Sequence, residues 1–224
     1  MMSFQKTCGL AAIGAGATYV IGFWVYFSII GPAQYGSPSI PVEQHVQFLA
    51  ENMDLMIVWN QIIYVLNAIL MVLIVIGLHR RLAASGALGQ TASAFGLIWA
   101  GLILATGMLT NIGIAQIVRL SAEDMDAAAT LWRSVMVVSS GLGGGNEITG
   151  GMWIFLLSLA GLKTKALPLG VNLLGVLVGG AGIISTIPAL SAATMVFGLG
   201  FIAWFFVVGM ALIWLKPLKE AEAR

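Results

Sequence analysis

Long, mostly apolar runs restrict this chain to a small set of folds. Several runs reach the roughly 20 residues that a helix needs to cross a bilayer. Only 8% of the residues are charged, against about 25% in a soluble domain, so water is not the solvent for most of the surface. We predict an all-α integral membrane protein in which residues 1–224 form one bundle of six transmembrane helices. The predicted spans are about 8–30, 55–78, 91–118, 131–162, 167–190 and 192–215.

The basic residues predict the orientation of this bundle. Most of them fall on one side of a six-span arrangement, and only Arg119 and Arg133 fall toward the other. Loops rich in Lys and Arg stay in the cytoplasm, so both termini are predicted to be cytoplasmic. The residues on the cytoplasmic side are Lys6, Arg80, Arg81, Lys163, Lys165, Lys216, Lys219 and Arg224.

A segment between the first two spans has a helical pattern of its own. In residues 41–53, the apolar residues Val42, Val46, Leu49 and Met53 recur at helical spacing and share one face. We predict a short amphipathic helix that lies on the outer surface of the membrane. The alternative is a lid that closes a cavity.

Glu147 is an acidic residue inside a predicted span. In one continuous helix over 131–162 it lies close to the bilayer midplane, where a carboxylate costs roughly 2–3 kcal/mol or more. Its same-face neighbours are all glycines, which makes a kink or an unwound turn possible at this point. Two functions stay open: a structural, hydrogen-bonded acid, or a site for a solute or a proton. The glycines are Gly143, Gly144, Gly150 and Gly151.

Polar side chains on two other spans are candidate partners of Glu147. Asn60, Tyr64 and Asn67 lie on one face of the second span, and Asn111 lies on the third. One hypothesis is a polar cavity, open to the outer side, on which these groups converge. The alternative is ordinary hydrogen bonding between helices. The candidate binding residues are Glu147, Asn146, Asn60, Tyr64, Asn67 and Asn111.

Small residues recur at the spacing that lets helix backbones approach closely. We interpret them as packing positions within the bundle; the alternative is an interface with another membrane protein. The three patterns are Gly141-x-x-x-Gly145, Gly175-x-x-x-Gly179 and Gly14-x-x-x-Thr18-x-x-x-Gly22.

Several kinds of chemistry lack the residues they need. Cys8 is the single cysteine and the chain has two histidines, which leaves no zinc-site or haem-ligand pattern. No serine has a plausible base nearby, and the glycine run before Asn146 lacks the Lys-Ser/Thr of a phosphate-binding loop. The net charge of +1 suggests no nucleic-acid partner. We predict no enzymatic activity, no cofactor and no metal.

Three short segments carry a resemblance to a known family. They are the Gly9-Leu10 start of the first span, the basic turn Leu78–Leu82, and the Lys-x-x-x-Leu-Pro-Leu-Gly entry to the fifth span at Lys163–Gly170. In these features the chain resembles an uncharacterised bacterial membrane family, domain of unknown function 4386. The resemblance implies a multi-pass protein of the bacterial inner membrane and assigns no catalytic residue.

Two functions are compatible with this sequence. The first is an accessory or structural subunit, whose partners are the lipid bilayer and other membrane proteins that contact its glycine-rich faces. The second is a protein that binds or transports a small solute or a proton in a polar cavity around Glu147. We expect the first.

Overall fold

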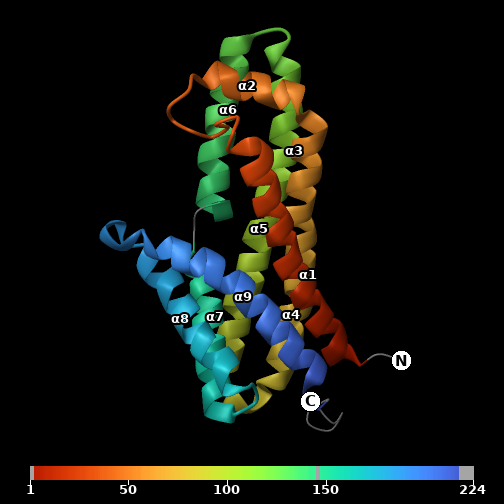
Figure 1. Cartoon of the computed structure of the whole chain (residues 1–224), viewed down its shortest axis with the longest axis vertical. Helices are drawn as coiled ribbons and strands as arrows, with labels where there is room; N and C mark the ends of the chain where they lie inside the picture. Colours follow the sequence, from red (N-terminus) through yellow and green to blue (C-terminus); the bar gives the residue numbers. More distant parts are fainter. Residues whose placement is uncertain (1–2, 145–146, 217–224) are drawn as a thin grey trace. The chain divides into compact units, whose positions relative to one another are not determined.

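The computed structural model describes residues 3–144 and 147–216. All regular elements in these ranges are helices, and no strand is present in them (Figure 1). The prediction of an all-α fold is confirmed.

Within the described ranges, four helices are long and apolar enough to cross a membrane. The first is α1 (Phe4–Val25) with its π-helical extension η1 (Tyr26–Ile30), and the second joins α3 (Met53–Asn60), η2 (Gln61–Leu66) and α4 (Asn67–Arg81). The others are α5 (Ala87–Ser121) and α9 (Ala193–Trp214), with a 3-10 turn, Ala83–Ser85, before α5. They correspond to the predicted spans 8–30, 55–78, 91–118 and 192–215.

The interval 131–162, predicted as one span, holds two helices. Helix α6 (Met125–Ser139) continues into the π-helical segment η4 (Ser140–Gly144), and α7 runs over Ile148–Thr164. Glu147 is not helical, and residues 145 and 146 lie outside the described ranges. Each interior glycine disfavours a helix by about 1 kcal/mol relative to alanine, and the run Gly141–Gly145 concentrates this cost.

The fifth predicted span, 167–190, is also shorter in the structure. Helix α8 covers Leu169–Ser185, and a 3-10 turn, Pro188–Leu190, follows it. Proline restricts the residue before it to extended conformations, and Ile187 has φ −84° and ψ 120°. Both α7 and α8 contain 17 residues, fewer than any of the four long helices.

The chain folds into two compact units, each built from segments that are far apart in the sequence. Unit 1 comprises residues 1–17, 68–101 and 146–224, and unit 2 comprises residues 18–67 and 102–145.

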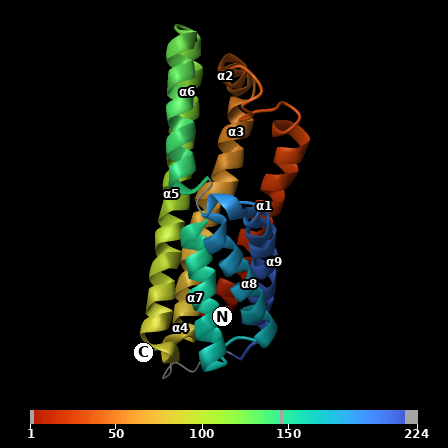
Figure 2. The ribbon, with the colours of Figure 1, turned by 90° about the vertical axis from the view of Figure 1, so that its left-hand side faces the viewer.

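Unit 1 is organised around an aromatic core. Helices α7, α8 and α9 pack side by side in chain order (Figure 2), and Trp99 of α5 joins them by lying on Trp153 with ring centroids 5.8 Å apart. Each ring of the core lies within 6.2 Å of another, so aromatic contacts bind α5, α7 and α9 together. The core rings are Trp99, Trp153, Phe197, Phe201, Trp204 and Phe205.

Glycines bring the helix backbones of unit 1 together. A Cβ atom on Gly151 of α7 would lie 2.9 Å from the Gly179 carbonyl oxygen of α8. Gly175, one turn before Gly179, packs on Ser158. The packing predicted for Gly175-x-x-x-Gly179 is confirmed as a contact within the chain. In unit 2, Gly22 packs on Ile63.

Hydrogen bonds at one end of unit 1 join the helix termini. The Gln5 amide donates to the Leu212 and Leu215 carbonyl oxygens at 2.8 and 2.9 Å. The Arg81 guanidinium donates to Gln5 Oε1 at 2.8 Å, to the Ala166 carbonyl at 2.8 Å and to the carbonyl of residue 216 at 3.2 Å. We call Gln5 and Arg81 the polar clasp of unit 1.

The predicted amphipathic segment forms α2 (Val42–Glu51) in unit 2. Its apolar face is covered by protein, because Val46 and Leu49 are fully buried in the core of this unit. This core also contains Val25, Ile30, Met56, Ile114, Ile117, Ala128 and Val135. A position of α2 on the membrane surface stays a prediction.

An aromatic cluster holds the loop before α2. His45 is 2% exposed and stacks on Trp132 with ring centroids 4.4 Å apart. The Gly36 N–H donates to His45 Nδ1 at 3.3 Å, so His45 Nε2 carries the proton and donates to the Ser37 carbonyl at 3.2 Å. The Trp132 indole donates to the Tyr35 hydroxyl at 3.2 Å, and burial raises the pKa of Tyr35 to about 12.

Acid should therefore loosen unit 2 through His45. Burial lowers the pKa of His45, against a smaller opposing effect of its bond to Ser37, and a proton on Nδ1 would break the bond from Gly36. Because the folded pKa lies below the unfolded value of about 6.5, the stabilisation is complete above that pH and is lost as the pH falls toward the lowered pKa. Denaturant unfolding between pH 7.5 and 5 should show this loss. His45→Phe keeps an aromatic ring against Trp132 but cannot bind a proton. The stability of this variant should therefore fall less than that of the wild-type protein between pH 7.5 and 5.

Candidate functional site

Glu147 lies at the N-terminal end of helix α7 and not in the middle of a helix. It occupies the residue before α7, its side chain makes no capping hydrogen bond, and its carbonyl accepts from the Gly151 N–H at 2.8 Å. A Cβ on Gly151 would lie 2.9 Å from the Ile183 nitrogen, so Glu147, one turn earlier, is level with the end of α8 at Ser185. The expectation of a mid-helix acid is wrong, because it assumed one continuous helix over 131–162.

The other predicted site residues belong to the second unit. Asn60, Tyr64, Asn67 and Asn111 lie in unit 2, and Glu147 lies in unit 1. Asn146 is outside the described residues. A single cavity shared by all six residues therefore stays a prediction, and the candidate site rests on the residues of unit 2.

Asn67 serves to join two helices. It is fully buried, and its Nδ2 donates to Thr18 Oγ1 of α1 at 2.7 Å. The sequence pattern marked Thr18 only as a small packing residue, yet it is the partner of this buried amide. For Asn67, the structure therefore supports ordinary hydrogen bonding between helices, the alternative to a polar cavity.

Asn60 and Asn111 lie at the same level of two adjacent helices. A Cβ on Gly107 of α5 would lie 2.6 Å from Tyr64 Cβ in η2. Met56, which precedes Tyr64 in the chain, belongs to the same core as Ile114, which follows Gly107. The two segments are therefore antiparallel. Asn60 is one turn from Tyr64 toward Met56, and Asn111 is one turn from Gly107 toward Ile114. We call Asn60 and Asn111 the amide pair.

The amide pair has buried hydrogen-bonding atoms without partners. Asn60 is 1% exposed, and its Nδ2 has no hydrogen-bond partner among the described residues. Both Nδ2 and Oδ1 of Asn111 are likewise buried without a partner in these ranges. Leaving a buried donor or acceptor unsatisfied costs about 1–3 kcal/mol. Such atoms commonly bond to a water or to another bound molecule.

An irregular helical turn lies directly beside the amide pair. Asn60 is followed by the π-helical segment Gln61–Leu66, and two more π-helical segments, Tyr26–Ile30 and Ser140–Gly144, occur in the same unit. Well under 1% of residues in globular proteins are π-helical, and π-helical turns are frequent at functional sites. The sequence pattern does not reveal these segments, because the spacing of apolar residues does not distinguish a π-helical turn from an α-helical one.

The surroundings of the amide pair are uncharged along both helices. Asp54 and Arg119 are the nearest charged residues of α3 and α5, six and eight positions away, or about 9 and 12 Å at 1.5 Å per residue. Among the described residues, no group of three His, Cys, Asp or Glu is arranged to hold a metal ion. The arrangement therefore suits an uncharged group that both donates and accepts hydrogen bonds.

Comparisons with models of protein families, with curated proteins and with solved structures find no match to this chain. The resemblance to domain of unknown function 4386 stays a prediction.

Proposed function

We propose that the protein is a multi-pass membrane protein that binds a small, uncharged solute at the amide pair of unit 2. The unsatisfied amide atoms of Asn60 and Asn111 are the observation that supports this function. A bound solute that carries both a donor and an acceptor would satisfy these atoms. The solute would be held between η2 and α5, next to the π-helical turn Gln61–Leu66.

A six-span arrangement with cytoplasmic termini is part of this proposal. Each of the 17-residue helices α7 and α8 is about 26 Å long, close to the roughly 30 Å of the hydrocarbon core. One face of α8 exposes apolar side chains, as a lipid-facing helix does: Leu169, Leu173, Leu177 and Ile184. The bacterial inner membrane implied by the family resemblance fits the same arrangement.

Native mass spectrometry of the full-length protein, gently extracted from its own membrane, tests the solute proposal. The wild-type protein should retain one small molecule, and Asn111→Leu should lose it. Thr110→Val is the matched control, because the Thr110 hydroxyl already donates to the Thr106 carbonyl at 2.7 Å. Loss of the molecule from both variants, or its absence from all samples, would contradict solute binding. A second polypeptide in fixed ratio would support the accessory-subunit function instead.

Stability measurements should separate the amide pair from Asn67. In solute-free protein, Asn111→Leu should leave the free energy of unfolding unchanged or raise it by about 1 kcal/mol, because it removes buried atoms without partners. Asn67→Leu should lower it by about 1–2 kcal/mol, because it removes the buried bond to Thr18. Unfolding in mixed micelles compares the two variants. Equal destabilisation would show that Asn111 is a structural residue.

A further inference from the structure

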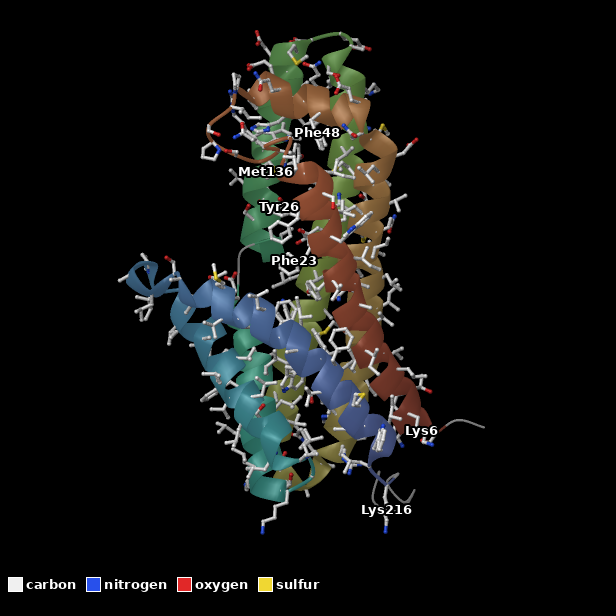
Figure 3. The ribbon with its side chains drawn as sticks, in the orientation of Figure 1. Lys6, Phe23, Tyr26, Phe48, Met136 and Lys216 are labelled. Carbon is white, nitrogen blue, oxygen red and sulfur yellow. The ribbon has the colours of Figure 1, made fainter. Side chains whose placement is uncertain are left out.

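One end of unit 1 collects basic side chains from several helices. The polar clasp places the start of α1, the end of α4, the loop before α8 and the end of α9 next to one another. Figure 3 shows Lys6 and Lys216 at this end. We call the exposed basic side chains of these segments and of the last turn of α7 the basic end: Lys6, Arg80, Lys163, Lys165 and Lys216.

No described acidic side chain of unit 1 neutralises the basic end. In unit 1, Glu147 is the single described carboxylate, and it precedes α7 while Lys163 lies in the last turn of that helix. This separates the two by about 24 Å. Glu220 and Glu222 lie outside the described residues. Arg81, by contrast, donates its hydrogen bonds to protein oxygens.

Apolar side chains lie next to these charges. Trp214, two residues before Lys216, is 81% exposed, and Leu10, one turn after Lys6, is also exposed. The guanidinium of Arg80 lies 5.4 Å from the centre of the exposed Phe4 ring. Aromatic rings of this kind are typical of the boundary between lipid headgroups and acyl chains. The charges and the rings together match a molecule with an anionic head and an apolar tail.

We propose that the basic end binds the phosphate of an anionic phospholipid, with Lys6, Arg80 and Lys216 as its main contacts. Lysine and arginine both bind phosphate oxygens, and basic pockets between membrane helices hold anionic headgroups. The acyl chains lie along the exposed apolar side chains of α1 and α9. Because the site belongs to unit 1, it is independent of the solute proposed for unit 2.

Native mass spectrometry of the delipidated full-length protein tests this site. Palmitoyl-oleoyl phosphatidylglycerol and the matched phosphatidylcholine are titrated separately. The anionic phosphatidylglycerol should bind more tightly than the zwitterionic phosphatidylcholine. Each lost charge weakens surface attraction by about 1 kcal/mol, so Lys6→Gln and Arg80→Gln should each weaken binding about fivefold. Arg133→Gln removes an exposed charge from unit 2 and should leave binding unchanged.

Three outcomes would overturn the proposal. Equal affinity for the two lipids would show that the anionic head is not recognised. Equal weakening by Arg133→Gln would show a general charge effect without a site. Displacement of the lipid by millimolar inorganic phosphate would show that the basic end binds free phosphate. Far-ultraviolet circular dichroism checks the fold of each variant, and Lys6→Gln alone decides the test if Arg80→Gln does not fold. Binding of phosphatidylglycerol by Asn111→Leu should equal that of the wild-type protein.

Discussion

Gly179→Ala should lower the free energy of unfolding by about 3 kcal/mol, an effect at the upper end of those caused by overpacking. The added Cβ would lie 2.5 Å from the backbone nitrogen of Phe155 and 2.8 Å from the carbonyl oxygen of Gly151. Both are backbone atoms of α7, so no side chain can rotate away to relieve the clash. Helices α7 and α8 would have to separate, which would also weaken the contact between Gly175 and Ser158.

Gly180→Ala is the matched control for this prediction. Nothing lies within 4 Å of a Cβ on Gly180, and alanine is the better helix former by about 0.8–1 kcal/mol. This neighbouring substitution should leave the stability unchanged or raise it slightly. Unfolding in mixed micelles can be followed by the fluorescence of Trp153 and Trp204, both buried in unit 1. Similar midpoints for the two variants would show that the close approach of α7 and α8 contributes little stability.

Arg81→Ala should have an effect of similar size, because it opens the polar clasp. The substitution removes the bonds to Gln5, to the Ala166 carbonyl and to the carbonyl of residue 216. A hydrogen bond to a charged group contributes about 1.5–3 kcal/mol. Allowing for the partial exposure of Arg81, we expect a loss of about 3 kcal/mol in total.

Two variants identify the cause of this loss. Arg80→Ala removes the same charge from the neighbouring position, where the guanidinium lies over the Phe4 ring, and should cost about 0.5–1 kcal/mol. Arg81→Lys keeps the charge but not the planar, forked set of donors, so most of the loss should persist. Full stability of Arg81→Lys in the same unfolding assay would show that charge alone matters at this position.

Hydropathy located the long helices well. The spans 8–30, 55–78, 91–118 and 192–215 each correspond to a long apolar helix, because helix length and apolar character are properties of one continuous segment. The interval 131–162 did not follow this rule. Its glycine run lies between two apolar segments, but glycine has a low helix propensity, and the spacing of apolar residues does not reveal that cost.

The candidate site was predictable only in part. Helical spacing brought Asn60, Tyr64 and Asn67 to one face, but it did not show which of the amide nitrogens has a hydrogen-bond partner. Asn67 has a partner because Thr18 of α1 lies opposite it. Asn60 Nδ2 has none in the described ranges. The difference depends on which residue a neighbouring helix presents at that level.

The sequence by itself determined that the chain is helical and apolar enough for a membrane, because both properties follow from local composition. It also located Gly175 and Gly179, two of the glycines that allow close packing. Only the tertiary structure decided that Gly179 meets the backbone of α7 and that the apolar face of α2 is covered by protein. It alone showed that α7 begins directly after Glu147. The packing results depend on contacts between segments far apart in the chain, and no local pattern encodes such contacts.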